Sequence, residues 1–153
     1  MSQDVWTVTV NQLAGFLWKV SPKTGKRIRK TVLSLNSRAH YRERAECMRL
    51  DRERIFAAAK NMPLTMPWAK VKLKVTLYGN KKHHSKDWEQ TIARLKGYID
   101  GLRDCRAITD DTMENIVSLD VKWVATTEEL ERTVIEVTQW PTENIIKELE
   151  NGK

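Results

Sequence analysis

Alternating apolar and polar residues predict the strands of this chain. The clearest alternation covers residues 70–78, where valines and leucines are separated by lysines and a threonine. A period of two is typical of a strand with one buried face, so we expect these lysines on the exposed face. Residues 4–10 alternate in the same way and are rich in valine and threonine, which favour strands. Further strands are predicted over residues 16–20, 31–35, 117–124 and 132–138.

Helices are predicted in the segments between these strands. Residues 38–60 follow polar residues that can cap a helix and consist mostly of good helix formers. Residues 61–68 contain prolines and are predicted to form a loop. A second helix is predicted over residues 88–103 and a terminal helix over residues 142–150. Helices and strands mixed in this way predict one α+β domain with a mixed β-sheet.

The second predicted helix divides its residues between two faces when they are placed at about 100° intervals. Its core face is predicted to consist of Ile92, Leu95, Ile99 and Leu102. Glu89, Lys96 and Asp100 share an adjacent polar face. Trp88, at the start of this helix, and Trp123 are predicted to be aromatic residues of the core.

Length and composition narrow the class of protein. The 153-residue chain suits one domain, which we place over residues 1–153, and its net charge of +7 suits a polyanion such as nucleic acid but also serves solubility. Cys47 and Cys105 have no CxxC neighbour, so neither a disulfide framework nor a zinc site is predicted. The chain begins without a signal-like segment and lacks a run of about 20 apolar residues. We therefore expect a cytoplasmic protein that does not enter a membrane.

A basic, turn-rich segment lies between the predicted strands at residues 16–20 and 31–35. Gly25 permits the positive φ that a tight turn requires, and a hairpin is therefore predicted. A dense run of positive charge is either a solvated loop or a surface that contacts phosphates. The basic residues of this hairpin are Lys19, Lys23, Lys26, Arg27, Arg29 and Lys30.

Acidic residues gather around the second predicted helix. The candidate site residues are Asp87, Glu89, Lys96, Asp100, Asp110 and Asp111. Taken singly, the first two acids can be a helix cap and a first-turn acid that complements the helix dipole. Lys96 and Asp100 can be an ordinary pair one turn apart, and the last two acids can be turn residues.

Taken together, these residues predict a metal site. Carboxylate oxygens are the ligands that Mg²⁺ prefers, and grouped carboxylates repel one another unless a cation lies between them. A lysine beside such a site can stabilise negative charge on a phosphate group.

The acidic segment also resembles a known family. Residues 87–111, DWEQTIARLKGYIDGLRDCRAITDD, resemble the signature of the RusA family of Holliday junction resolvases, with phage and prophage members closest in spacing. That signature is Asp-x-Asp-Asn, a lysine, Asp-Gly-Leu or Asp-Ala-Leu, and a paired Asp-Asp. Residues 33–44, LSLNSRAHYRER, are similar to the family's Leu-x-x-Asn-x-x-x-His segment. The resemblance covers about residues 31–138 and leaves residues 1–30 and 139–153 outside it.

This resemblance implies a RusA-like fold and a homodimeric, Mg²⁺-dependent endodeoxyribonuclease, with Mn²⁺ as a possible substitute, that resolves four-way DNA junctions in a bacterial host. It implies metal binding by Asp87, Glu89, Asp110 and Asp111, catalysis by Asp87, Glu89, Lys96 and Asp111, and a supporting role for Asp100. The sequence departs from the family pattern at Glu89 and Gln90, where Asp and Asn are usual. It also has Arg106 where a glycine, which readily adopts the left-handed conformation of a helix end, is common.

The expected DNA contacts are basic residues of the hairpin, the first helix, the basic strand and the loop after it. They are Lys23, Lys26, Arg27, Arg29, Lys30, Arg38, His40, Arg42, Lys72, Lys74, Lys81, Lys82 and His83. Two other functions fit the same sequence. The chain can be a branched-DNA-binding protein without nuclease activity, or a phage structural or accessory protein that binds no divalent metal.

Overall fold

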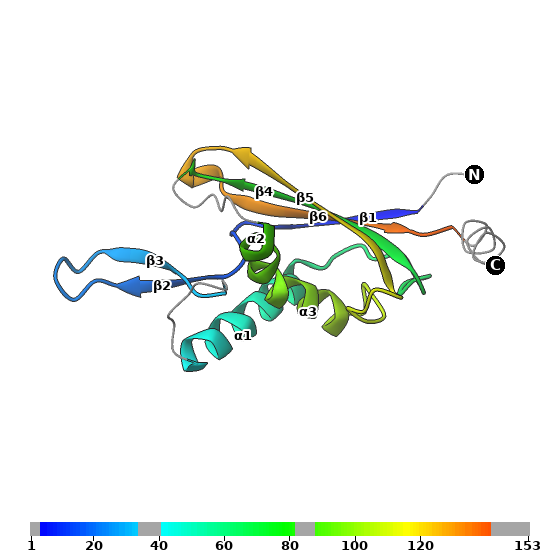
Figure 1. Cartoon of the computed structure of the whole chain (residues 1–153), viewed down its shortest axis with the longest axis horizontal. Coiled ribbons are helices and arrows are strands. Elements are labelled where there is room, and N and C mark those ends of the chain that lie inside the picture. Colours follow the sequence, from blue (N-terminus) through cyan, green and yellow to red (C-terminus); the bar gives the residue numbers. More distant parts are fainter. Residues whose placement is uncertain (1–3, 34–40, 82–87, 142–153) are drawn as a thin grey trace.

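The computed structural model describes residues 4–33, 41–81 and 88–141. These residues form one α+β domain in which a four-stranded sheet lies over the helices and a two-stranded arm extends to one side (Figure 1). The α+β class predicted from the sequence is therefore confirmed. The predicted helix over residues 142–150 lies outside the described residues. No helix within the described ranges is long and apolar enough to cross a membrane.

The four-stranded sheet is mixed, as the sequence predicts. Its strands are β1 (Val5–Val10), β4 (Val71–Gly79), β5 (Ile116–Ala125) and β6 (Arg132–Gln139), in the order β1-β6-β4-β5. β6 pairs antiparallel with both β1 and β4, whereas β4 and β5 are parallel. Parallel neighbours need a crossover connection, and the helices between β4 and β5 provide it. The candidate site residues that the structure describes all belong to this crossover. They are Glu89, Lys96, Asp100, Asp110 and Asp111.

Burial along β4 confirms the alternation read from the sequence. Val71, Leu73, Val75 and Leu77 are buried against the helices. Lys72 and Lys74 point to the opposite, exposed face of the sheet. The helices therefore cover one face, and the other face presents the basic residues that were predicted there.

The helices are α1 (Tyr41–Ala58), α2 (Trp88–Arg94) and α3 (Lys96–Asp104), and a 3₁₀ turn, η2 (Glu128–Leu130), precedes β6. α1 and α3 pack unusually closely because two glycines of α3 face α1. A Cβ atom on Gly97 would lie 2.6 Å from Asp51 Cβ, and one on Gly101 would lie 2.7 Å from Ile55 Cβ. The glycine of the Asp-Gly-Leu segment is thus explained by helix packing.

The predicted helix over residues 88–103 is broken. The Leu95 N–H donates to the Ile92 carbonyl in a tighter three-residue turn, and α3 begins after this residue. A single helical phase does not extend across such a break. The predicted core face is therefore confirmed for Leu95 and Leu102, which are fully buried. The prediction is wrong for Ile92, which is 45% exposed. Trp88 is 64% exposed, so its prediction as a core residue is also wrong.

The arm consists of β2 (Phe16–Val20) and β3 (Arg27–Thr31), paired antiparallel. The predicted strand over residues 31–35 is wrong by several positions, because the turn is shorter than the sequence suggests. The Ser21 N–H donates to the Lys26 carbonyl at 2.8 Å, and the Gly25 N–H donates to the Ser21 carbonyl at 2.8 Å. Basic residues occupy most of β3, so the hydrophobic pattern that would mark a strand is lacking.

Candidate functional site

The chain reverses direction at the end of α3. The Ala107 N–H donates to the Leu102 carbonyl at 2.8 Å, and the Arg106 N–H donates to the Arg103 carbonyl at 3.1 Å. This pair of bonds is a Schellman motif, which requires a left-handed residue at Arg106. Arg106 has a φ of 64°, so the conformation expected of a glycine at this position is present in an arginine. The reversal directs the following segment back along α3.

The returning segment is fixed against the chain that leads into β4. Ile108 forms a parallel bridge with Trp68, and the Thr109 hydroxyl donates to the Trp68 carbonyl at 3.2 Å. Beyond the acidic pair, the Asn115 side chain donates to the Ala69 carbonyl at 3.1 Å. Asp110 and Asp111 are therefore held on a loop that is anchored on both sides.

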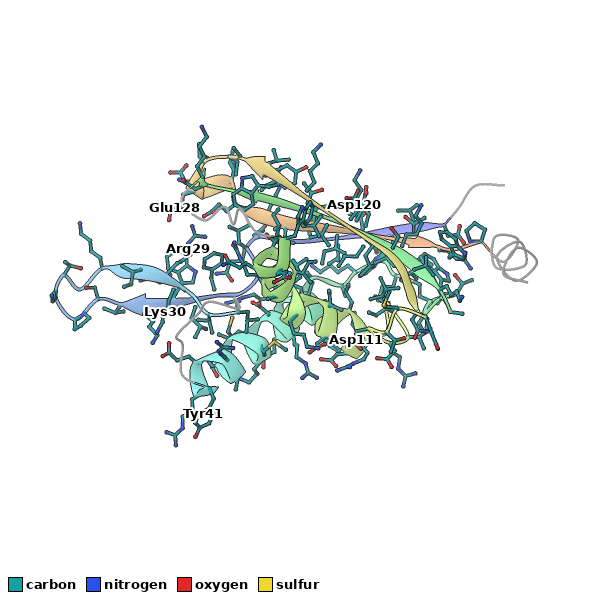
Figure 2. All side chains as sticks on the ribbon, viewed as in Figure 1. Arg29, Lys30, Tyr41, Asp111, Asp120 and Glu128 are labelled. Carbon is teal, nitrogen blue, oxygen red and sulfur yellow. The ribbon has the colours of Figure 1, made fainter. Side chains whose placement is uncertain are left out.

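This geometry places Lys96 between two carboxylates. The Lys96 Nζ atom lies 3.3 Å from Asp100 Oδ1 and 3.3 Å from Asp111 Oδ2. Arg103 approaches the same loop, with its Nη1 atom 3.8 Å from Asp110 Oδ1 and 4.0 Å from Asp111 Oδ1. Figure 2 shows Asp111 at the end of α3 that faces away from the arm. The structure thus brings together the lysine and three of the acids that the sequence singled out.

The charges of the site influence one another. Hydrogen bonding to the Asp110 side chain and to the Lys96 ammonium lowers the pKa of Asp111, although partial desolvation opposes this shift. Partial burial tends to lower the pKa of Lys96, but its hydrogen bonds to Asp100 and Asp111 outweigh this effect and raise it. Both groups therefore carry full charge near neutral pH.

Asp100 differs from the surface residue that helical phase predicted. Its side chain is only 7% exposed, whereas that of Lys96 is 56% exposed. A buried carboxylate needs a partner, and the Lys96 ammonium one turn earlier is that partner. Asp100 therefore binds the Lys96 ammonium from within the same helix, and Asp111 binds the same ammonium from the loop.

Of the remaining candidate ligands, only Glu89 is described, and it forms no metal-binding cluster with the loop aspartates. Glu89 is exposed at the start of α2, and Asp87 lies outside the described residues. Among the residues that the structure describes, no three histidine, cysteine, aspartate or glutamate side chains lie close enough together to hold a metal ion. The donor chemistry of Asp110 and Asp111 suits Mg²⁺, but a complete site needs acids beyond this pair.

Arg103 is a residue of this site that is not among those predicted from the sequence. This residue follows Lys96 by two helical turns, which places both on the same face of α3. Its guanidinium approaches both loop aspartates, so it supplies positive charge next to Lys96. Helical phase alone can find this residue, because α3 is continuous from Lys96 to Asp104.

The predicted DNA contacts fall into several groups. Arg38, His40, Lys82 and His83 lie outside the described residues. Lys74 and Lys81 are exposed, Lys72 lies over the ring of Trp140 at 5.6 Å, and Arg42 lies over the ring of Tyr41 at 5.9 Å. On the arm, Lys23, Lys26 and Arg27 are exposed, whereas Arg29 and Lys30 form ion pairs with glutamates.

Comparison with known proteins adds no assignment to this geometry. No protein-family model matches the chain, and no curated protein matches it.

Proposed function

We propose that this protein is a Mg²⁺-dependent endonuclease that cuts branched DNA, with a RusA-like arrangement of catalytic residues. The observation that carries the proposal is the contact of Lys96 with both Asp100 and Asp111, at 3.3 Å each. The acidic signature of the family resemblance contains these same three residues. Asp111 is distant from Lys96 along the chain but in contact with it in the fold, which supports the interpretation of the signature as one site.

Each residue has a role in this proposal. Asp110 and Asp111 are the loop carboxylates that would hold Mg²⁺. The family resemblance adds Asp87, which lies outside the described residues, and Glu89, which forms no metal-binding cluster with the loop pair in this structure. The ion would supply a polarised water and offset negative charge at the scissile phosphate. Lys96 contacts a phosphate oxygen and stabilises the charge that develops there. Asp100 is a positioning residue, because its buried carboxylate orients the Lys96 ammonium.

A metal ion can bind the loop acids only if Asp111 is ionised and if Lys96 can move away from it. Asp111 is ionised near neutral pH and 30% exposed, so its oxygens are available to a hard cation. Lys96 is 56% exposed and has room to turn from Asp111 towards a phosphate. Binding of Mg²⁺ and of a phosphate would therefore replace the Lys96–Asp111 ion pair by a contact of Asp111 with the metal and a contact of Lys96 with the phosphate.

The proposal is tested with a labelled four-way junction and Mg²⁺. Asp111→Asn removes one charge from the site and should abolish cleavage, whereas Asp120→Asn removes the same charge from an exposed position on β5 and should leave cleavage unchanged. Equal cleavage by the parent and by Asp111→Asn would show that the site is assigned wrongly. A parent protein that binds junctions but cuts none in Mg²⁺ or Mn²⁺ would show that it is not a nuclease.

A second function, binding of branched DNA without cleavage, is favoured by the ion pairs of the site. Lys96 and Arg103 together contact Asp100, Asp110 and Asp111. An acidic loop that is already neutralised in this way can be purely structural. Calorimetric titration with Mg²⁺ separates the two functions, because only the nuclease requires binding that Asp111→Asn abolishes.

We also propose that the protein acts as a homodimer on DNA. A four-way junction has near two-fold symmetry, and a two-fold dimer would present one site to each of two opposed strands. Sedimentation of the free protein and of its junction complex measures the stoichiometry directly. One copy bound to each junction would contradict a dimer.

A further inference from the structure

The β2–β3 arm has two faces, and each face is attached to the body by carboxylates. Pairing of Leu17 with Lys30 and of Trp18 with Arg29 assigns Leu17, Lys19, Ile28 and Lys30 to one face and Phe16, Trp18, Val20, Arg27 and Arg29 to the other. A two-stranded ribbon is only marginally stable in water by itself. The contacts of its two faces therefore decide whether the arm is rigid.

The first face is held by α1. Glu43 forms ion pairs with two lysines of the arm, with Lys19 Nζ at 2.5 Å and Lys30 Nζ at 3.1 Å from its carboxylate. Beneath this contact, Leu17 is buried in a small cluster with Cys47 of α1. Hydrogen bonding to both lysines lowers the pKa of Glu43, which keeps it ionised at neutral pH. One carboxylate thus fixes both strands of the arm to the helix.

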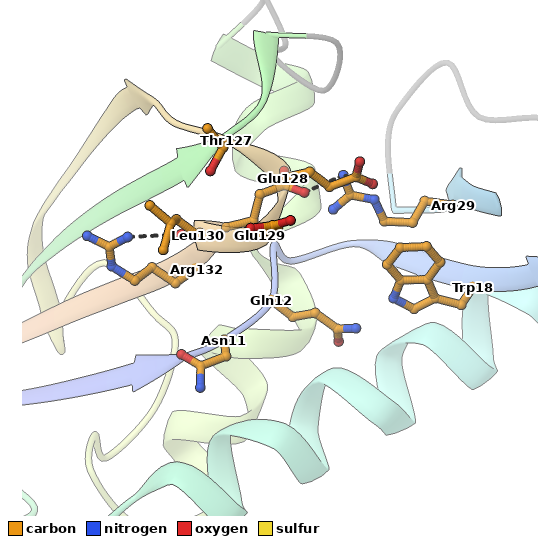
Figure 3. Close-up of a pocket in the computed structure, with 10 residues that line it drawn as sticks. Asn11, Gln12, Trp18, Arg29, Thr127, Glu128, Glu129, Leu130 and Arg132 are labelled. Carbon is orange, nitrogen blue, oxygen red and sulfur yellow. Dashed lines mark hydrogen bonds and ion pairs between the residues drawn. The ribbon is translucent and has the colours of Figure 1, made fainter. Parts of the chain in front are cut away.

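The second face is held by the segment around η2. Arg29 forms an ion pair with Glu131, and both side chains are only 5% exposed. Its Nη2 atom also lies 3.8 Å from Glu128 Oε1, an approach that Figure 3 shows across the groove between the arm and η2. This groove has a volume of about 1100 Å³, and Glu129 adds a further acid to its wall. Phosphates are disfavoured here because the acids outnumber the available cations.

Aromatic rings extend this attachment along the arm. The Arg29 guanidinium lies 5.3 Å from the ring of Phe16 and 5.2 Å from the ring of Trp18, and the Arg27 guanidinium lies 4.7 Å from Trp18 on the outward side. Cation–π contacts of this kind restrict long side chains to one orientation. Arg27 is consequently held against Trp18, next to the turn at the free end of the arm.

The end of the arm has a different charge balance. Lys23, Lys26 and Arg27 are exposed, and they have no carboxylate partner among the residues that the structure describes. Val20 and Ile28, at 64% and 49% exposed, flank them on opposite faces. We call Lys23, Lys26 and Arg27 the arm tip. The basic residues of the hairpin thus divide into a base that is paired with carboxylates and a tip that has no carboxylate partner among the described residues.

We propose that the β2–β3 arm is a rigid ribbon and that its tip binds the phosphates of one duplex of the branched DNA. This inference rests on the proposed function for the identity of the DNA. It assigns the phosphate contacts to the arm tip and gives Lys19, Lys30 and Arg29 the separate task of holding the ribbon. A two-stranded ribbon fits the major groove of B-DNA, and lysines at its end can reach the backbone on either side.

The test compares two variants with the same loss of charge. Lys23→Ala/Lys26→Ala removes the lysines of the arm tip, and Lys60→Ala/Lys122→Ala removes two exposed lysines from the body. Binding to a four-way junction is measured over a range of salt concentrations in EDTA, so that cleavage does not enter. Melting temperatures establish that both variants are folded.

We expect the arm-tip variant to bind about tenfold more weakly or worse, with a salt dependence shallower by about 2 in slope, and the body variant to bind like the parent. Equal binding by the arm-tip variant and the parent would overturn the inference, as would equal losses in both variants or a parent that binds no DNA. Cleavage in Mg²⁺ is scored separately. If the protein does not cut but shows the expected difference in binding, the proposed nuclease activity is refuted and the proposed DNA contact of the arm tip stands.

Discussion

Lys96 and Asp111 lie on opposite sides of a chain reversal, yet the Lys96 Nζ atom and an Asp111 carboxylate oxygen are 3.3 Å apart. The reversal itself depends on the left-handed backbone of Arg106, and the return of the loop depends on its bonds to Trp68. The contact is therefore produced by tertiary structure, and it places the exposed Lys96 ammonium beside an ionised carboxylate.

Lys96→Met should separate metal binding from cleavage. In the proposed function the Lys96 ammonium competes with Mg²⁺ for Asp111, so its removal should let the metal bind at least as tightly as in the parent. Cleavage of a four-way junction should nevertheless fall by about 100-fold or more, because the charge on the phosphate loses its stabilising partner. The two quantities are measured by calorimetric titration and by single-turnover cleavage.

Lys96→Arg is the matched variant, since it retains the charge but changes the shape and donor geometry. We expect it to recover part of the lost cleavage. If Lys96→Met cuts at the parental rate, Lys96 has no part in the chemistry and its contacts are structural.

Arg106→Gly should stabilise the protein. The left-handed conformation at φ 64° costs a residue with a Cβ atom about 1 kcal/mol or more, and glycine adopts it without that cost. Because glycine also makes the unfolded chain more flexible, we expect a net gain of about 0.5–1 kcal/mol in the free energy of unfolding. Urea denaturation measures this gain.

Arg106→Ala serves as the control, because it removes the same long side chain while keeping the Cβ atom. A similar increase for both variants would mean that the side chain, and not the backbone conformation, is responsible. A decrease for Arg106→Gly would contradict the strain at this helix end.

The sequence predicts most of the regular elements because burial follows their periodicity. β1, β4, β5 and β6 each lie within two residues of a predicted strand, and α1 falls inside the predicted first helix. β3 escapes prediction because Arg27 to Lys30 lack apolar alternation, and its stability comes from partners such as Glu43 and Glu131 that are distant in sequence. The break at Leu95 has no proline or glycine at that residue to signal it.

The candidate site is predictable to a similar extent. The pairing of Lys96 with Asp100 follows from helical phase, and the left-handed residue at position 106 follows from the family resemblance. The resemblance assigns Asp111 and Lys96 to one site, but the direct contact between them requires the hydrogen bond from Thr109 to Trp68, which neither argument predicts. The arm charges show the same limit, since the sequence cannot separate the paired Arg29 from the exposed Arg27.

Gly97→Ala and Gly101→Ala should each destabilise the contact between α1 and α3. Alanine normally favours a helix by about 1 kcal/mol over glycine, but here the new Cβ atom would lie 2.6 Å from Asp51 or 2.7 Å from Ile55. Both neighbouring atoms are Cβ atoms fixed to the α1 backbone, so the helices must move apart. We expect a net loss of about 1–3 kcal/mol in the free energy of unfolding, measured by urea denaturation.

An unchanged or increased stability in both glycine variants would contradict this packing. Because Lys96 and Asp100 belong to the same helix, we also expect Gly97→Ala to weaken junction cleavage. The substitution Lys122→Ala, at an exposed position of β5, provides a control for handling and concentration.

Asp51 should make the stability of the protein depend on pH. This buried residue of α1 accepts a hydrogen bond of 2.9 Å from the N–H of Gly15, at the root of the arm, and pairs with Arg54 at 2.6 Å. Burial raises the pKa of Asp51 to about 6, although the bonds from Gly15 and Arg54 oppose the shift. The folded protein thus binds a proton more tightly than the unfolded chain, in which the pKa is about 4.

Protonated Asp51 therefore favours folding. Its contribution is fully present below pH 4 and is lost as the pH rises through about 6, with a total change of about 3 kcal/mol. Asp51→Asn keeps an oxygen that can accept the Gly15 hydrogen bond but cannot ionise. The difference in the free energy of unfolding between the parent and Asp51→Asn, measured from pH 4 to pH 8, isolates this group from all others. We expect the difference to shift against the parent as the pH rises, and parallel profiles would show that Asp51 titrates alike in both states.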